Sequence, residues 1–173
     1  SLVTPGQMVF SNLTKNYIIC GAGLSGSAGL TLEGSGTVTL TNVNAFAGSL
    51  VISNGTFVLG GAGQLGGGTY STTITDNGVL NYNSSASQTL SGAIFGTGVM
   101  TNNGSGTLAL SSGASTFSGG VALNAGTLSV GASSTPASGM VTSGPLGTGT
   151  LILNGGTFNF TGGGYNLANN VYV

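Results

Sequence analysis

Gly106-Thr-Leu-Ala-Leu110 is one of six short segments in this chain that share a pattern: a Gly, usually a Thr, an apolar residue, any residue and a second apolar residue. The other five are Gly36-Thr-Val-Thr-Leu40, Gly55-Thr-Phe-Val-Leu59, Gly78-Val-Leu-Asn-Tyr82, Gly126-Thr-Leu-Ser-Val130 and Gly156-Thr-Phe-Asn-Phe160. Such recurrence is typical of a solenoid, in which each repeat buries its apolar face only by stacking on its neighbours.

The alternation within each segment predicts which side chains face the interior, because successive residues of a strand point to opposite sides. With one segment per coil, the chain is predicted to be an all-β, parallel β-helix (β-solenoid) of about seven to eight coils, or roughly 35 Å long. The Thr side chains are predicted to form one exterior ladder of Thr37, Thr56, Thr107, Thr127 and Thr157. The predicted interior columns are Val38, Leu40, Phe57, Leu59, Leu80, Tyr82, Leu108, Leu110, Leu128, Val130, Phe158 and Phe160.

An internal duplication divides the chain. Residues 33–40 match 103–110, residues 46–59 match 117–130, and residues 74–82 match 152–160. We therefore expect an N-terminal arm and first coil over 1–19, one repeat unit over 20–89, a second over 90–166, and the start of a further coil over 167–173. The second unit is longer because of a Ser-, Pro- and Gly-rich segment at about 132–144, which we predict to be a surface loop.

Composition excludes several classes of function. The chain has 173 residues, with one Lys or Arg, two Asp or Glu and no His. Electrostatic binding of nucleic acid needs clustered Lys and Arg, so we expect no nucleic-acid partner. No apolar run reaches the roughly 18 residues of a membrane helix, so we expect no membrane insertion. A net charge close to zero leaves little repulsion between copies and favours self-association.

The stretch Gly104-Ser-Gly-Thr-Leu-Ala-Leu110, then Phe117, then Asn124-Ala-Gly-Thr-Leu-Ser-Val130, resembles the autotransporter-associated β-strand repeat. The resemblance is strongest in the second unit and extends over most of the chain from about Cys20. It implies a right-handed parallel β-helix of the kind found in secreted bacterial passenger domains, and hence an extracellular, secreted or cell-surface location.

The two carboxylates raise the alternative of a polysaccharide-cleaving enzyme. Polysaccharide-cleaving β-helices need paired carboxylates or a metal, and the two acids here, Glu33 and Asp76, each lie just ahead of a Gly-led strand, roughly 10 Å apart along the axis. Their counterparts in the second unit are Asn103 and Asn154, so the solenoid does not require a carboxylate there. We expect no enzyme and no catalytic, cofactor-binding or metal-binding residues; a polysaccharide-cleaving enzyme stays a remote alternative.

The sequence also gives predictions for Cys20 and for the tyrosines. Cys20 aligns with Leu90 and Leu167 and is predicted to be buried as a small apolar side chain, with a bridge between subunits as the alternative. The five Tyr residues, together with exposed Asn and Ser, are candidates for contacts with cell-surface or matrix glycans. Stacking in the core explains Tyr82 better.

The two ends of the chain suggest self-assembly, since a solenoid has unpaired backbone groups at its first and last coils. We predict a structural subunit of a secreted filament, polymerising head to tail with copies of itself through its end strands. The alternative is a passenger-like adhesin fragment that binds a surface or glycan. The predicted assembly residues are Leu2, Val3, Met8, Val9, Phe10, Leu167, Val171, Tyr172 and Val173.

Overall fold

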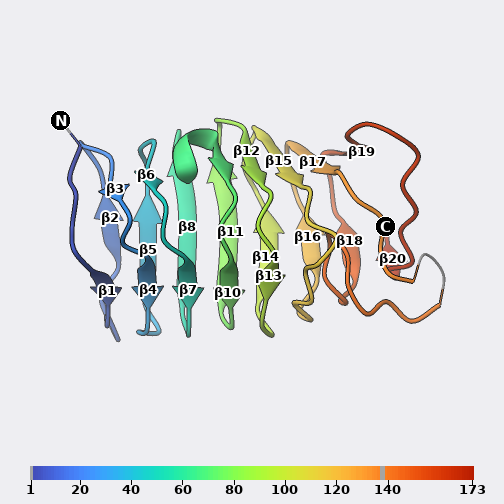
Figure 1. The fold of residues 1–173 in the computed structure, drawn as a ribbon, viewed down its shortest axis with the longest axis horizontal. Coiled ribbons are helices and arrows are strands. Elements are labelled where there is room, and N and C mark those ends of the chain that lie inside the picture. Colours follow the sequence, from blue (N-terminus) through green and yellow to red (C-terminus); the bar gives the residue numbers. More distant parts are fainter. Residues whose placement is uncertain (1, 137–138) are drawn as a thin grey trace.

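The computed structural model describes residues 2–136 and 139–173, and it shows a rod built from strands that stack turn upon turn (Figure 1). Every pairing between its strands is parallel, and the described residues form no α-helix. A single 3₁₀ turn, η1, spans Gly66–Gly68. Among the described residues, no helix is long and apolar enough to cross a membrane. The predicted all-β solenoid is confirmed.

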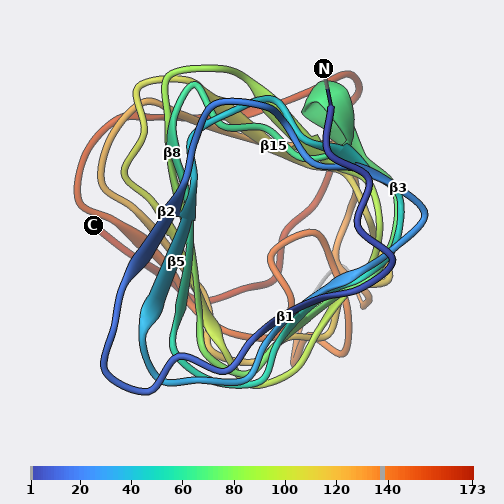
Figure 2. The ribbon, with the colours of Figure 1, turned by 90° about the vertical axis from the view of Figure 1, so that its left-hand side faces the viewer.

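One sheet runs the whole length of the rod and gives it eight turns, one strand per turn. We call it the long sheet. Viewed from the N-terminal end in Figure 2, the chain runs clockwise as it recedes, so the β-helix is right-handed, as the family resemblance implied. In the order of turns 1 to 8, the long sheet contains β2 (Tyr17–Ile19), β5 (Thr37–Leu40), β8 (Thr56–Gly61), β11 (Val79–Ser84), β14 (Val99–Asn102), β16 (Val121–Leu123), β18 (Leu151–Leu153) and β20 (Val171–Tyr172).

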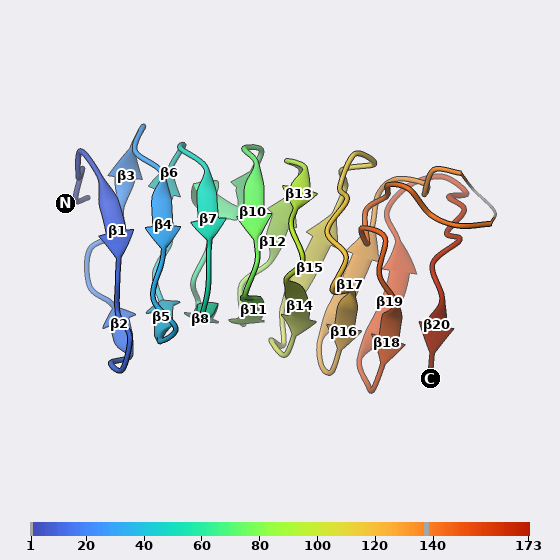
Figure 3. The same cartoon turned by 90° about the horizontal axis from the view of Figure 1, so that it is seen from below.

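Two five-stranded sheets form other parts of the wall. The N-terminal sheet, seen face on in Figure 3, contains β1 (Met8–Phe10), β4 (Leu30–Leu32), β7 (Leu50–Ile52), β10 (Ile74–Asp76) and β13 (Ile94–Phe95). The C-terminal sheet contains β9 (Thr69–Tyr70), β12 (Gln88–Leu90), β15 (Thr107–Leu110), β17 (Thr127–Val130) and β19 (Thr157–Phe160). A two-stranded pair, β3 (Ser25–Gly26) and β6 (Ala45–Phe46), completes the first turns.

The six Gly-led segments lie on two sheets, which corrects the prediction of one shared set of columns. Those at Gly36, Gly55 and Gly78 lead into β5, β8 and β11 of the long sheet, whereas the later three lead into β15, β17 and β19 of the C-terminal sheet. The predicted Thr ladder is therefore two ladders, Thr37 on Thr56 and Thr107 on Thr127 on Thr157. The 28-residue step from Gly78 to Gly106 contains one full turn and one additional face.

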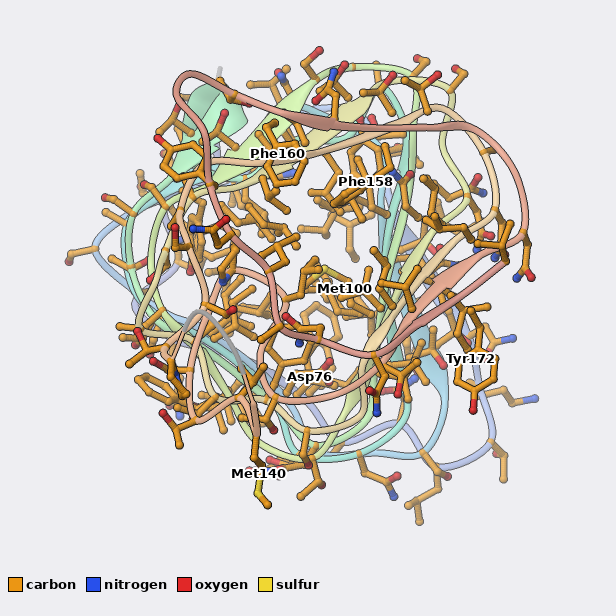
Figure 4. All side chains as sticks on the ribbon, turned by 90° about the vertical axis from the view of Figure 1, so that its right-hand side faces the viewer. Asp76, Met100, Met140, Phe158, Phe160 and Tyr172 are labelled. Carbon is orange, nitrogen blue, oxygen red and sulfur yellow. The ribbon has the colours of Figure 1, made fainter. Side chains whose placement is uncertain are left out.

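The interior is filled by stacked aliphatic and aromatic side chains. Ten of the twelve predicted interior residues are at most 2% exposed. The prediction is wrong for Phe160, which is 45% exposed, and only partly right for Phe158, which is half-buried. Both rings point into the solenoid (Figure 4), but β19 is the outermost strand of its sheet, so no further strand of that sheet covers them.

Residues 131–150 separate β17 from β18 and carry the predicted loop, of which residues 137–138 lie outside the described residues. Thr135 and Ser143 form an antiparallel bridge, and Met140 is 88% exposed at the periphery (Figure 4). Leu146 is buried in the core at the base of this segment.

Close approach of one turn to the next makes certain glycines irreplaceable. Gly126 has a φ of +60°, and a Cβ on it would lie 2.2 Å from the carbonyl oxygen of Gly104 and 2.6 Å from that of Gly106. Both the backbone conformation and the neighbouring turn therefore exclude a side chain at this corner.

We expect Gly126→Ala to lower the free energy of unfolding by about 2 kcal/mol or more, because it adds left-handed strain to a backbone clash. Gly163→Ala is the matched control, since Gly163 has ordinary φ and no heavy atom within 4 Å of the added Cβ. Urea denaturation followed by circular dichroism compares the two. Equal losses for both variants would contradict the stacking constraint.

Candidate functional surfaces

The two carboxylates do not form a pair. Asp76 stacks on Ile52, and Ile52 stacks on Leu32, so the Asp76 side chain points inward and is 1% exposed. Glu33 is the residue after Leu32 and therefore points outward, where it accepts a hydrogen bond of 3.0 Å from the Ser11 hydroxyl. The wall of the solenoid lies between the two groups, and neither inverting nor retaining glycosidase geometry is assembled here.

The Asp76 carboxyl lies in an enclosed site at the corner between β10 and β11 (Figure 4). Its Oδ1 accepts a hydrogen bond of 3.0 Å from the Gly78 N–H, while its Oδ2 is buried without a partner. Burial raises the pKa of Asp76 from 3.8 to about 6, and the backbone N–H groups of Gly78 and Leu80 oppose the rise. The group is thus a destabilising charge in the interior at neutral pH.

Cys20 is exposed, so the predicted burial is wrong. It follows Ile19, which stacks on the inward Leu40, and so it points outward beside Thr41. The alignment with Leu90 is displaced by one residue. Tyr17 stacks on Val38, and Gln88 stacks on Leu108, which is the counterpart of Val38. Tyr17 and Gln88 are therefore equivalent. Cys20, three residues after Tyr17, corresponds to the outward Ser91, three residues after Gln88.

The predicted assembly residues lie at the two ends of the rod. Met8 is 7% exposed and belongs to the core, and Phe10 and Leu167 are half-buried against it. Residues 2–10 lie in the first turn, where Val3 bridges Leu24 and β1 pairs with β4. The others are exposed: Leu2, Val3, Val9, Val171, Tyr172 and Val173.

The tyrosines do not form a common platform for sugars. Tyr70 and Tyr82 are buried and donate their hydroxyl hydrogens to the carbonyl oxygens of Gly48 and Ala86. Tyr17 and Tyr172 are exposed, but they lie in turns 1 and 8, at opposite ends of the rod. Burial raises the pKa of Tyr82 to about 12.

The outer side of the C-terminal sheet carries hydroxyl groups in parallel rows, a feature that the one-ladder prediction did not reveal. Thr69, Thr89 and Ala109 stack in one row, and Thr107, Thr127 and Thr157 in the next. A third row of hydroxyl groups lies just after the ends of the strands and contains Ser71, Ser91, Ser111 and Thr161. Together these half-buried or exposed residues form what we call the hydroxyl face: Thr69, Ser71, Ser87, Thr89, Ser91, Thr107, Ser111, Thr127, Thr157 and Thr161.

A small pocket of about 200 Å³ adjoins the first strand of the hydroxyl face. Thr69 and Ser71 line it, and the edge-on pair of Phe46 and Tyr70, with ring centroids 5.8 Å apart, lies beneath. Each hydroxyl can donate and accept a hydrogen bond. The hydroxyl face and its pocket therefore offer many neutral hydrogen-bonding groups and no charge.

A second repetitive feature follows the strands of the long sheet. Asn103 donates to Asn81 at 2.9 Å, Asn124 donates to Asn103 at 2.6 Å, and Asn154 donates to Asn124 at 2.7 Å. This amide ladder links turns 4 to 7 on the outside of the wall. Because these amides largely satisfy one another, they stiffen the rod and leave the hydroxyl face as the better ligand surface.

These features define a class of protein: a right-handed parallel β-solenoid with an apolar interior and repetitive, largely uncharged outer faces. Comparison with known families refines the class. Residues 30–59 and 100–130 match the passenger-associated-transport-repeat, and the chain therefore carries two repeats of the autotransporter passenger type, as the sequence resemblance predicted.

One curated relative is the Adhesin BmaC autotransporter of Brucella suis biovar 1 (strain 1330). The two sequences are 34% identical over an alignment of 182 residues, which covers 80% of this chain. The chain spans about 5% of the length of that relative. No solved structure matches the chain. The comparisons favour the adhesin alternative over the filament subunit.

Asp76 gives a prediction for stability against pH. Its pKa is higher in the folded protein than its usual value of 3.8, so the folded state retains the proton between about pH 4 and pH 6 while the unfolded chain loses it. Stability should be greatest below that window and fall as the pH rises through it. Asp76→Asn should be more stable than the parent by up to about 3 kcal/mol near pH 7.5 and nearly equal to it near pH 4.

Urea denaturation at several pH values measures this difference. Glu33→Gln is the control, because Glu33 is exposed and its substitution should leave the pH profile of the parent intact. A parent protein whose stability does not fall between pH 4 and 6 would contradict the burial of this carboxyl.

Proposed function

We propose that this chain is a rigid segment of a bacterial surface adhesin of the autotransporter passenger type, and that it contacts uncharged glycans through the hydroxyl face. The observation that carries the proposal is the similarity to an autotransporter adhesin over 80% of this chain. The passenger-type repeats support an extracellular location.

The chemistry of the hydroxyl face supports a neutral ligand. A glycan has many hydroxyl groups, and the face offers hydroxyl donors and acceptors at the regular spacing of about 4.8 Å between strands. No Lys, Arg, Asp or Glu belongs to the face. Each contact is weak, so affinity arises from many rungs that act together along an extended ligand.

The small pocket gives this face a defined end. Its volume of about 200 Å³ is below that of usual small-molecule sites, and it suits one ring of an extended chain better than a whole compact ligand. The sugar ring would lie near Thr69 and Ser71, over the edge of the buried aromatic pair.

The uncovered end turns do not favour the filament. Any solenoid turn that lacks a neighbour exposes its inward and edge residues, whether the neighbour belongs to the same chain or to another. The exposure of Val171, Tyr172 and Val173 is therefore compatible with both functions.

The experiment compares binding of the purified chain to arrays of neutral and acidic glycans. A triple variant, Thr89→Ala with Thr107→Ala and Thr127→Ala, should weaken binding to neutral glycans about tenfold, since each lost hydrogen bond contributes about 0.5 kcal/mol. The matched control is Thr31→Ala with Thr73→Ala and Thr75→Ala at the N-terminal sheet, and it should bind as the parent does.

Salt provides the second readout. Because no charge takes part, raising the NaCl concentration from about 0.15 M to about 1 M should change the affinity by less than about twofold. Equal binding by the two triple variants, or a steep dependence on salt, would contradict the proposed surface.

A further inference from the structure

The outer side of the long sheet carries a run of exposed apolar side chains beside the amide ladder. Its middle row runs from turn 1 to turn 8 as Ile18, Thr39, Val58, Asn81, Thr101, Ala122, Ile152 and Tyr172. The adjacent row contains Thr37, Thr56, Val79 and Val99 in turns 2 to 5. Four of these side chains, Ile18, Val99, Ile152 and Tyr172, are exposed by 38% to 68%, and Tyr172 points away from the wall in Figure 4.

Apolar residues lie at both ends of the middle row, and Val79 and Val99 lie at the centre of the adjacent row. A two-fold axis along the strand direction, between turns 4 and 5, would lay two copies face to face with the order of turns reversed. Turn 4 then faces turn 5, so Val79 meets Val99 of the second copy and Asn81 meets Thr101. Further out, Val58 meets Ala122, Thr39 meets Ile152, and Ile18 meets Tyr172.

We propose that the long sheet is a self-association surface, through which two copies of this chain pack face to face with their axes antiparallel. Such an interface is isologous, since the same patch serves both copies. In these two rows apolar residues meet apolar residues or Thr methyl groups, and the polar Asn81 meets a Thr hydroxyl. The amide ladder of Asn103, Asn124 and Asn154 borders the patch at the C-terminal ends of the strands. The inference goes beyond the adhesin function and does not depend on it.

The area suits a weak contact between two copies. Eight strands spaced by about 4.8 Å and about four residues long on average present roughly 38 Å by 13 Å, or about 500 Å² per copy. The total of about 1,000 Å² is typical of a weak, transient interface rather than of an obligate one. Sheets packed in this way keep their strands within about 30° of each other, which the two-fold axis along the strands allows.

Charge favours the long sheet over the other faces. Its outward rows contain no Lys, Arg, Asp or Glu, and the net charge of the chain is −1, so two copies do not repel each other strongly. The N-terminal sheet has five strands rather than eight and carries the exposed Glu33 at its edge. The hydroxyl face is polar and is well solvated by water.

Sedimentation equilibrium of the 173-residue chain tests the proposal. The parent should form a dimer with a dissociation constant in the micromolar range. Val79→Lys places an unpaired charge at the centre of the interface and should raise that constant about a hundredfold or more. Thr31→Lys, on the outer side of the N-terminal sheet, is the matched control and should dimerise as the parent does.

A mixture of two variants tests the antiparallel arrangement. Val99→Glu should also dissociate alone. Mixed in equal amounts with Val79→Lys it should recover dimers, because the introduced Lys faces the introduced Glu on one side of the axis and Val meets Val on the other. Circular dichroism verifies that each variant folds. If either does not, Ala122→Lys and Val58→Glu replace the pair, because residues 122 and 58 face each other across the same axis.

Three results would overturn the proposal. They are a parent chain that is monomeric at all accessible concentrations, equal association of Val79→Lys and Thr31→Lys, and a mixture that stays monomeric while its parent dimerises. Glycan binding is measured separately, so loss of dimers and loss of the adhesin function are distinguishable.

Discussion

The constraint on which this structure depends is the parallel pairing of each turn with the next in fixed register. Leu30 stacks on Leu50 and Leu50 on Ile74, so each inward residue is covered by its equivalent one turn away. The backbone of one turn must approach the next closely at the corners, where Gly126 meets the carbonyl oxygens of the preceding turn. Apolar burial, the side-chain ladders and the flat outer faces all follow from this register.

The sequence predicts the class of fold because strand alternation and the Gly-led repeat are local signals. It also identifies most of the core, from Val38 to Val130. It does not predict the face on which a strand lies. Gly78 and Gly106 begin equivalent segments, yet β11 belongs to the long sheet and β15 to the C-terminal sheet. The face on which a strand lies depends on the total number of residues in the corners that precede it, and no local sequence pattern encodes that total.

One-residue differences at corners also decide which side of the wall a candidate residue faces. The sequence match pairs Asp76 with the outward Asn154, but Asp76 stacks on Ile52, whose counterpart Leu123 stacks on the inward Leu153. The same match pairs Cys20 with an inward Leu, whereas its structural counterpart is the outward Ser91. In a helix such a shift rotates a side chain by about 100°, whereas in a strand it exchanges the interior for solvent. Sequence alignment alone is therefore weakest at the property that matters for function, which is the side of the wall.

The same arithmetic explains why the outer faces differ from one another. The two family matches begin at residues 30 and 100, so the repeat advances from the N-terminal sheet to the long sheet, by three turns and one additional face. Equivalent strands therefore wind around the rod instead of repeating on one side. The long sheet contains Gly-Thr strands in its first half and apolar strands such as β18 in its second. The hydroxyl face lies on the C-terminal sheet, which contains the Gly-Thr strands β15, β17 and β19. A chain of simple repeats acquires chemically distinct faces in this way, and each face can take a separate partner without any change in the interior packing.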